Sequence, residues 1–138
     1  MIKNDNVLVV DIDGTLCPAE RGDTSYADLA PEPLLVKRLQ ELAAAGWHII
    51  LHSSRNMRSY NGNTGVINAK TLPVLLQWLG RHEVPYHEIY MGKPWPGHNG
   101  FYIDDRAVRP REFLEHTQEE LLALCERDRV AKPVASSR

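Results

Sequence analysis

The stretch that decides the fold is VLVVDIDGTL, residues 7–16, in which an apolar run leads directly into two aspartates. A short apolar run that ends at a turn signal is typical of a buried strand. The carboxylates of Asp11 and Asp13 repel each other unless a cation or a proton lies between them. Gly14 tolerates backbone angles that other residues avoid, so the chain can turn directly after the aspartates. The stretch therefore predicts a strand that delivers two carboxylates to a turn.

The composition of the 138-residue chain fits a globular protein, with 43% hydrophobic residues and a formal net charge of −2. This charge provides no basic surface for nucleic acid and no polybasic segment for a membrane. Apolar runs are too short to span a bilayer and no signal peptide is visible, so we expect a cytoplasmic protein. Cys17 and Cys125 lack the spacing of a zinc site or a disulfide framework. We expect one domain over residues 1–127 and a disordered tail over residues 128–138.

Apolar segments alternate with helical patterns along the chain. The predicted strands are residues 7–10, 47–52, 88–91 and 101–103, and the predicted helices are residues 33–46, 68–82 and 117–127. Strands that alternate with helices indicate βαβ units and a mostly parallel sheet. The sequence therefore predicts an α/β fold, specifically a Rossmann-like three-layer sandwich.

The predicted helices carry recognisable signals at their ends. Gly46 is a C-terminal signal for the first helix, whose apolar positions include Leu35 and Leu39. Asn68 is a candidate N-cap for the second helix, which would place Pro73 close to its first turn. The third helix begins with TQEE, residues 117–120, which has the spacing of a capping box.

Polar residues follow each predicted strand, at the edge of a parallel sheet where ligands bind. In strand order they are Asp11 and Asp13, then Ser53 and Ser54, then Lys93, and finally Asp104 and Asp105. Mg²⁺ commonly takes one or two protein carboxylates together with water and substrate phosphate. A lysine and a hydroxyl beside such an ion suit the binding of a phosphoryl group. An aspartate can then attack phosphorus, while a second aspartate transfers the proton.

Each of these signals has a simpler interpretation when it stands alone. A pair of nearby aspartates is more often a solvated turn or a helix cap than a metal site. A lysine beside carboxylates is, by default, part of a surface ion pair. The simpler interpretations lose ground here because a second apolar segment also ends in two aspartates, Asp104 and Asp105.

The segments DIDGTL, ILHSSR, GK and YIDD resemble, in this order, the four motifs of the haloacid dehalogenase-like (HAD) hydrolase superfamily. The resemblance implies that Asp11 is the nucleophile and binds Mg²⁺. It implies that Asp13 is the acid and base of the reaction and offers its backbone carbonyl to the same ion. Members that cleave carbon–halogen or carbon–phosphorus bonds lack the second aspartate, so Asp13 favours a phosphomonoester hydrolase.

The remaining motifs imply the other site residues. Ser53 and Lys93 are implied to bind phosphate, although the choice between Ser53 and Ser54 stays open. Asp104 is implied to be a direct metal ligand. Asp105 is implied to contact the metal through a water molecule or to support the residues that bind the metal.

The sequence between the motifs leaves no room for an inserted cap domain. Only a loop separates Asp13 from the helix near Pro33, and one loop, one helix and one strand separate Ser53 from Lys93. The chain thus resembles a capless member of the superfamily. Capless members either act on large substrates or use neighbouring subunits to cover the site when the substrate is small. Because water must still be excluded from the reaction, we expect a homo-oligomer in which a neighbour covers the site.

The loop RNMRSYNGNTGVIN, residues 55–68, is the most distinctive candidate for substrate selection. Its candidate substrate-binding residues are Arg55, Asn56, Arg58 and Asn63, although an ordinary polar loop would have a similar composition. Together with the segments around Lys93 and Asp104, this loop resembles HAD-like phosphatases associated with capsular polysaccharide biosynthesis. That likeness implies a sugar phosphate or a related polysaccharide precursor as the substrate.

Three other functions compete with a phosphatase on the basis of these residues. A phosphorelay receiver domain is disfavoured, because Ser53 stands where a receiver has its phosphorylated aspartate. A non-catalytic module that binds phosphate and Mg²⁺ is disfavoured by the complete set of charged residues. A phosphotransferase or phosphomutase of the same fold stays open, because the sequence does not show whether water or another hydroxyl accepts the phosphoryl group.

Overall fold

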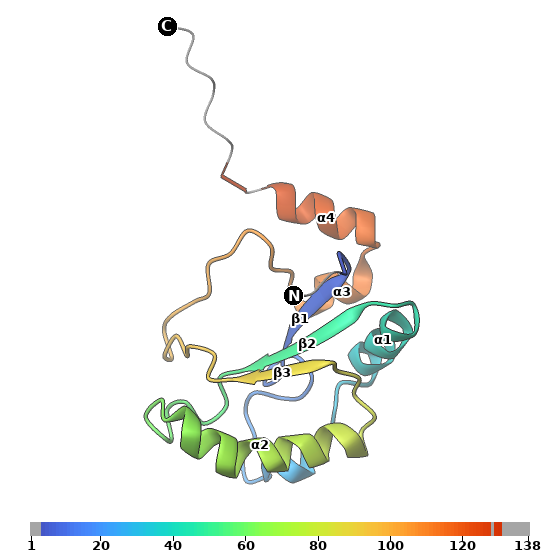
Figure 1. Ribbon diagram of the computed structural model, residues 1–138. Helices are drawn as coiled ribbons and strands as arrows, with labels where there is room; N and C mark the ends of the chain where they lie inside the picture. The colour runs from blue at the N-terminus through green and yellow to red at the C-terminus, as the bar shows by residue number, and fades with distance from the viewer. Residues whose placement is uncertain (1–3, 128, 131–138) are drawn as a thin grey trace, which may run out of the picture. The chain divides into compact units, whose positions relative to one another are not determined.

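The computed structural model describes residues 4–127 and 129–130, and these residues form two compact units that meet in the sequence between Gly97 and His98. The first unit contains β1 (Val7–Asp11), the short 3-10 helix η1 (Tyr26–Asp28), α1 (Pro33–Ala44), β2 (His48–Ser53), α2 (Thr64–Arg81) and β3 (Glu88–Met91). The second unit contains α3 (Pro110–Glu115) and α4 (Gln118–Arg127) (Figure 1). The tail predicted over residues 128–138 lies almost wholly outside the described residues.

The sheet of the first unit has three parallel strands in the order β1-β2-β3. Leu51 in the central strand is the register partner of Val10 in β1 and of Ile89 in β3. Helix α1 contacts β2, and α2 contacts both β3 and η1. This arrangement confirms the predicted α/β class and parallel sheet, and it is consistent with a Rossmann-like fold.

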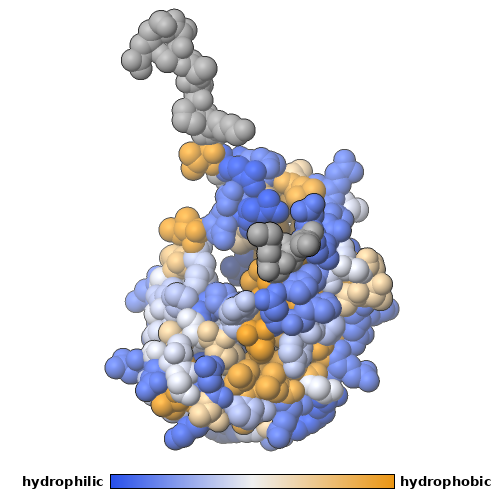
Figure 2. All heavy atoms as spheres, in the orientation of Figure 1, coloured by the Kyte–Doolittle hydropathy of each residue, from blue (hydrophilic) through white to orange (hydrophobic). Residues whose placement is uncertain are grey.

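The core of the first unit lies between the central strand and the two helices. Ile49 and Leu51 of β2 and Leu39 of α1 are fully buried, as is Leu75 of α2. Among the tryptophans, Trp78 is 1% exposed, and its indole N–H donates a hydrogen bond to the Leu29 carbonyl at 2.8 Å. Hydrophilic residues cover much of the visible surface, with smaller groups of hydrophobic residues between them (Figure 2). The packed core fixes the strands whose ends carry the predicted site.

Helix α2 begins earlier than the sequence predicts. Its N-cap is Asn63, whose side-chain oxygen accepts a hydrogen bond from the Val66 N–H at 3.1 Å, and Asn68 lies inside the helix. Pro73 is therefore an interior residue rather than a first-turn residue. A proline there leaves the carbonyl four residues earlier, that of Ala69, without its helical partner. Both residues lie on the exposed side of α2, where water can hydrate that carbonyl.

The other predicted helix ends agree with the structure. Helix α1 ends at Ala44, and Gly46 follows in the left-handed region with φ +98°. At the start of α4, the Thr117 N–H donates to Glu120 Oε1 at 2.8 Å, and the Glu120 N–H donates to Thr117 Oγ1 at 3.2 Å. The predicted capping box is thus confirmed. The short helix α3 was not predicted. Among the described residues, no helix is long and apolar enough to cross a membrane.

The predicted strand at residues 101–103 is wrong, since this segment has no strand structure. Phe101 is 84% exposed and Ile103 is 99% exposed. A run of only three apolar residues forms few ladder hydrogen bonds, and a strand is stable only when it pairs with a neighbour. Gly97 and Gly100, which precede the run, add backbone freedom that opposes an extended conformation.

Candidate active site

The carboxyl ends of the three strands bring together three residues that the sequence singles out. Asp11 is the last residue of β1, Ser53 is the last residue of β2, and Lys93 follows β3 by two positions. The Lys93 N–H donates a hydrogen bond to the Ser53 carbonyl at 3.0 Å. This bond extends the pairing of β2 and β3 beyond the last residue of β3 and fixes the backbone of the lysine at the edge of the sheet.

The carboxylate of Asp11 lies beside the ammonium group of Lys93. Lys93 Nζ is 3.5 Å from Asp11 Oδ1, and the Thr15 hydroxyl donates to Asp11 Oδ2 at 3.4 Å. The Asp11 side chain is 36% exposed, whereas that of Lys93 is 18% exposed. Both contacts of the carboxylate are long, so Asp11 is held loosely and has one side open to a ligand.

A tight turn directly after β1 separates the two aspartates. The Ile12 carbonyl accepts hydrogen bonds from the N–H groups of Thr15 and Leu16 at 3.0 and 2.8 Å. Gly14 adopts φ +89°, a left-handed conformation in which glycine carries no steric penalty. The turn directs Asp13 toward different partners from those of Asp11, which is how the chain accommodates two nearby carboxylates.

Asp13 forms a two-point ion pair with Arg55. Arg55 Nε donates to Asp13 Oδ2 at 3.0 Å, and Arg55 Nη2 donates to Asp13 Oδ1 at 2.9 Å. The Arg55 side chain is only 2% exposed and that of Asp13 is 24% exposed. The guanidinium carbon of Arg55 also lies 4.2 Å from the centre of the Tyr26 ring. A bidentate pair of this kind fixes both the position and the orientation of the carboxylate.

Cys17 completes the surroundings of Asp13. Its thiol lies 3.5 Å from Asp13 Oδ1 and 3.8 Å from Arg55 Nη2, and the residue is 1% exposed. Burial, reinforced by the negative charge of Asp13, raises the pKa of the Cys17 thiol to about 12. The thiol is therefore protonated and acts as a hydrogen-bond donor rather than as a nucleophile.

The pKa of His52 depends on the charged groups near the ends of β1 and β3. His52 is the register partner of both Asp11 and Tyr90. Burial lowers the pKa of His52 below its usual value, the ammonium of Lys93 lowers it further, and the carboxylate of Asp11 opposes this shift. The imidazole is thus held in its neutral form near a cationic group.

Ser53 is 1% exposed, and its Oγ accepts a hydrogen bond from the Arg55 N–H at 3.0 Å. Because Oγ already serves as an acceptor in this bond, its own proton remains free to be donated elsewhere. Ser54 is partly exposed and its carbonyl accepts the Met57 N–H at 3.0 Å.

The loop residues predicted to contact substrate have different partners. Asn56 accepts a hydrogen bond from the Thr71 hydroxyl at 2.8 Å and adopts φ +62°. The guanidinium of Arg58 lies 5.6 Å from the centre of the Trp95 ring. Asn63 is the N-cap of α2, as described above. Of the four candidates, Arg55 is the one that pairs with a site carboxylate, and the use of Arg55, Asn56, Arg58 and Asn63 for substrate binding stays a prediction.

Gly92 makes the close approach of β3 to α2 possible. It adopts φ +86°, and a Cβ atom at this position would lie 2.9 Å from the Thr64 Cγ2 atom. No real Cβ contact is that short, so a side chain here would displace either the start of α2 or the turn that carries Lys93.

Asp104 and Asp105 belong to the second unit. Asp104 Oδ1 accepts a hydrogen bond from the Arg106 N–H at 2.8 Å, and Asp105 Oδ2 accepts one from Arg129 Nε at 2.8 Å. Their predicted roles at a metal ion stay predictions. Within the described part of the chain, no group of three or more histidine, cysteine, aspartate or glutamate residues is arranged to hold a metal ion.

Several residues around the aspartates were missed from the sequence. Thr15 and Cys17 lie in the turn after β1, and their spacing of four residues from Asp11 and Asp13 was an available signal. Tyr26 is the first residue of η1 and contacts Arg55, which is 29 positions further along the chain by residue number. Nothing local in the sequence could have indicated that contact.

Comparisons with known proteins give one informative match. No protein-family model matches the chain, and no curated protein matches it. A crystal structure of a structural-genomics target from Vibrio cholerae is 48% identical in sequence and has a TM-score of 0.84. The match covers 90% of this chain and 99% of the Vibrio cholerae chain. At this identity and coverage, the chain belongs to the same protein family as the Vibrio cholerae protein.

Proposed function

We propose that this protein is a Mg²⁺-dependent phosphomonoester hydrolase of the HAD superfamily that lacks a cap domain and acts on a sugar phosphate or a related polysaccharide precursor. The observation that carries the proposal is the distance of 3.5 Å between the Asp11 carboxylate and the Lys93 ammonium. A carboxylate with one open side and a cation fixed beside it is suited to attack on a phosphoryl group.

Asp11 attacks phosphorus through a carboxylate oxygen, and the bond from phosphorus to the leaving oxygen breaks as the new bond forms. The ammonium of Lys93 stabilises the charge on the non-bridging oxygens, and the Ser53 hydroxyl donates a hydrogen bond to one of them. Water then attacks the phosphorus of the aspartyl-phosphate, which releases phosphate and restores the Asp11 carboxylate.

Asp13 gives a proton to the leaving oxygen in the first step and takes one from water in the second. Asp13 Oδ1 accepts hydrogen bonds from Arg55 Nη2 and from the Cys17 thiol, whereas Oδ2 accepts one from Arg55 Nε and keeps a second acceptor position for the transferred proton. Arg55 acts as a positioning residue in this proposal, because it holds the carboxyl group that moves the proton.

The donor set at this edge fits Mg²⁺. Within the described part of the chain, the Asp11 oxygens contact Thr15 and Lys93 at 3.4 and 3.5 Å, and these long contacts leave the carboxylate available to a hard cation. The Asp13 backbone carbonyl would supply a second oxygen, and Asp104 is proposed as a further ligand on the sequence resemblance alone. When bound, the ion would neutralise charge on the phosphoryl oxygens.

The test is phosphate release from a panel of sugar phosphates, with and without Mg²⁺. We expect Asp11→Asn to reduce kcat by about 10³-fold or more, because the nucleophile is lost. Asp5→Asn serves as the matched control, since Asp5 is exposed and lies before β1. Equal phosphate release by Asp11→Asn and the wild type would exclude Asp11 as the nucleophile. Free phosphate as the product, rather than a phosphorylated acceptor sugar, would distinguish a hydrolase from a phosphotransferase.

A further inference from the structure

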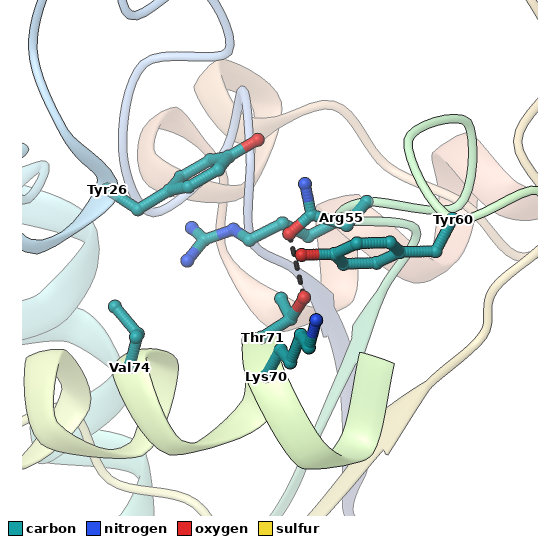
Figure 3. Close-up of a pocket in the computed structure, with 7 residues that line it drawn as sticks. Tyr26, Arg55, Tyr60, Lys70, Thr71 and Val74 are labelled. Carbon is teal, nitrogen blue, oxygen red and sulfur yellow. Dashed lines mark hydrogen bonds between the residues drawn. The ribbon is translucent and has the colours of Figure 1, made fainter. Parts of the chain in front are cut away.

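A cavity of about 280 Å³ lies in the first unit, between η1, the loop after β2 and helix α2. Its lining residues are Tyr26, Arg55, Asn56, Tyr60, Lys70, Thr71 and Val74. Figure 3 shows Tyr26 and Tyr60 on opposite sides, with Lys70, Thr71 and Val74 on α2 below them. The volume is near the lower end of the range of roughly 300–1,000 Å³ that is typical of small-molecule sites, which suits one sugar ring.

Arg55 links this cavity to the candidate active site. The same guanidinium that holds the Asp13 carboxylate at 2.9 and 3.0 Å also lines the cavity. The cavity is therefore one side chain away from the group proposed to protonate the leaving oxygen. Arg55 is thus the residue that the cavity and the proposed reaction share.

Three hydrogen-bond donors around the cavity have no side-chain partner among the residues that the structure describes. They are the hydroxyls of Tyr26 and Tyr60 and the ammonium group of Lys70. In contrast, Asn56 and Thr71 are bonded to each other at 2.8 Å, which fixes that wall (Figure 3). Polar groups that point at an open cavity without protein partners are typical of a site for a polar ligand.

The charges of the residues around the cavity favour an anionic ligand. The positive charge of Arg55 is already compensated by Asp13, and none of the described residues that line the cavity is acidic. Lys70 therefore contributes an uncompensated positive charge, while the Tyr60 ring and Val74 contribute apolar surface. Such a lining matches a hydroxyl-bearing ring with an acidic substituent.

We propose that this cavity binds the leaving-group part of the substrate, and that this part is a sugar carrying a second anionic group that pairs with Lys70. The inference rests on the proposed phosphatase function and adds the substrate class to it. The second anionic group is a carboxylate or a second phosphate, and both would bind the same ammonium group.

Binding without turnover tests the inference independently of catalysis. Asp11→Asn protein is titrated calorimetrically with glucose 1-phosphate, glucuronic acid 1-phosphate and glucose 1,6-bisphosphate. We expect glucuronic acid 1-phosphate or glucose 1,6-bisphosphate to bind about tenfold more tightly than glucose 1-phosphate. Whichever of these two binds more tightly shows whether the second anionic group is a carboxylate or a phosphate. Adding Lys70→Met should remove this preference, whereas adding Lys37→Met, an exposed lysine on α1, should preserve it.

Hydrolysis by the protein with an intact Asp11 separates the two proposals. The Lys70→Met variant should raise KM for the acidic sugar phosphate more than KM for p-nitrophenyl phosphate, whereas Lys37→Met should change neither. Equal binding of all three sugars, or a preference that survives in Lys70→Met, would overturn the inference even if p-nitrophenyl phosphate is hydrolysed. Preferential binding that depends on Lys70, without hydrolysis of any ester, would support the cavity assignment and contradict the phosphatase.

Discussion

Two segments of the chain run from apolar residues into a pair of aspartates, residues 7–13 and residues 101–105, and only the first forms a strand. In the first segment, β1 pairs along its whole length with β2, and a turn follows. In the second segment, Phe101 and Ile103 are exposed. The difference shows that an apolar run specifies a strand only where a neighbouring strand accepts its hydrogen bonds.

The same two segments each contain an aspartate paired with an arginine, but in different environments. The Asp13–Arg55 pair is largely buried and bidentate, whereas the Asp105–Arg129 pair is exposed, with 48% of the Asp105 side chain accessible. Distances are similar in the two pairs, at 2.8–3.0 Å. Burial rather than distance therefore decides how much each pair contributes to stability.

Replacing the arginine of each pair gives the largest expected difference. We expect Arg55→Met to lower the free energy of unfolding by about 3 kcal/mol, because it leaves the Asp13 carboxylate partly buried without its cation. Arg129→Met should leave the urea midpoint unchanged, since water solvates Asp105 once the arginine is lost. Urea titration followed by circular dichroism measures both variants. Equal midpoints for the two variants would show that burial does not distinguish the pairs.

Two glycines, Gly92 after β3 and Gly97 at the end of the first unit, extend the comparison between the paired strand and the segment that forms no strand. Gly92 follows a paired strand and Gly97 precedes the segment that forms no strand, and both have positive φ, +86° and +75°. A Cβ at Gly97 would meet no atom within 4 Å, whereas one at Gly92 would meet Thr64. We expect Gly97→Ala to cost about 1 kcal/mol from backbone strain alone and Gly92→Ala about 2 kcal/mol, with steric overlap added.

A second substitution checks the cause of that difference. Thr64→Ser removes the Cγ2 atom, so it should recover part of the stability that Gly92→Ala loses and none of the stability that Gly97→Ala loses. Thermal unfolding of the single and double variants measures this coupling. If Thr64→Ser restores nothing in the Gly92→Ala background, the close approach of β3 to α2 is not the source of the cost.

The smallest expected effect is a change in the titration of His52, which tests the charges at the end of β1. We expect the His52 midpoint, followed by NMR, to lie below the usual value of 6.5. Lys93→Gln should raise the pKa by removing a cation, and Asp11→Asn should lower it by removing an anion. Shifts in the same direction in both variants would contradict the arrangement of these three residues.

The lowered pKa of His52 also has a consequence for stability. The folded protein favours the neutral imidazole more strongly than the unfolded chain does. His52 therefore contributes stability that is present above pH 6.5 and is lost as the pH falls through the folded-state pKa.

The sequence was sufficient to predict the first unit where local patterns and tertiary pairing agree. The strands β1 to β3 and the residues at their carboxyl ends were predicted because four to six consecutive positions of mostly apolar character mark each strand. The start of α2 was missed because Pro73 resembled a first-turn proline, although Asn63 carried the actual N-cap signal.

The partners of the site residues could not be predicted from the sequence. Asp13 and Arg55 are separated by 42 positions, and no local pattern specifies which of the two arginines at positions 55 and 58 turns inward. Packing decides this choice, because Tyr26 covers the Arg55 guanidinium while Arg58 stays at the surface. The cavity is formed by the same packing, so the sequence could not predict it either.

In the proposed function, the face of α2 that lines the cavity is separate from the residues that react. Lys70 and Val74 stand one helical turn apart, so they present adjacent side chains to the cavity. The residues proposed to react lie instead at the end of β1 and on the turns after β1 and β3. Under the proposed function, substitutions at positions 70 and 74 alone would therefore change which sugars bind and leave the reacting residues in place.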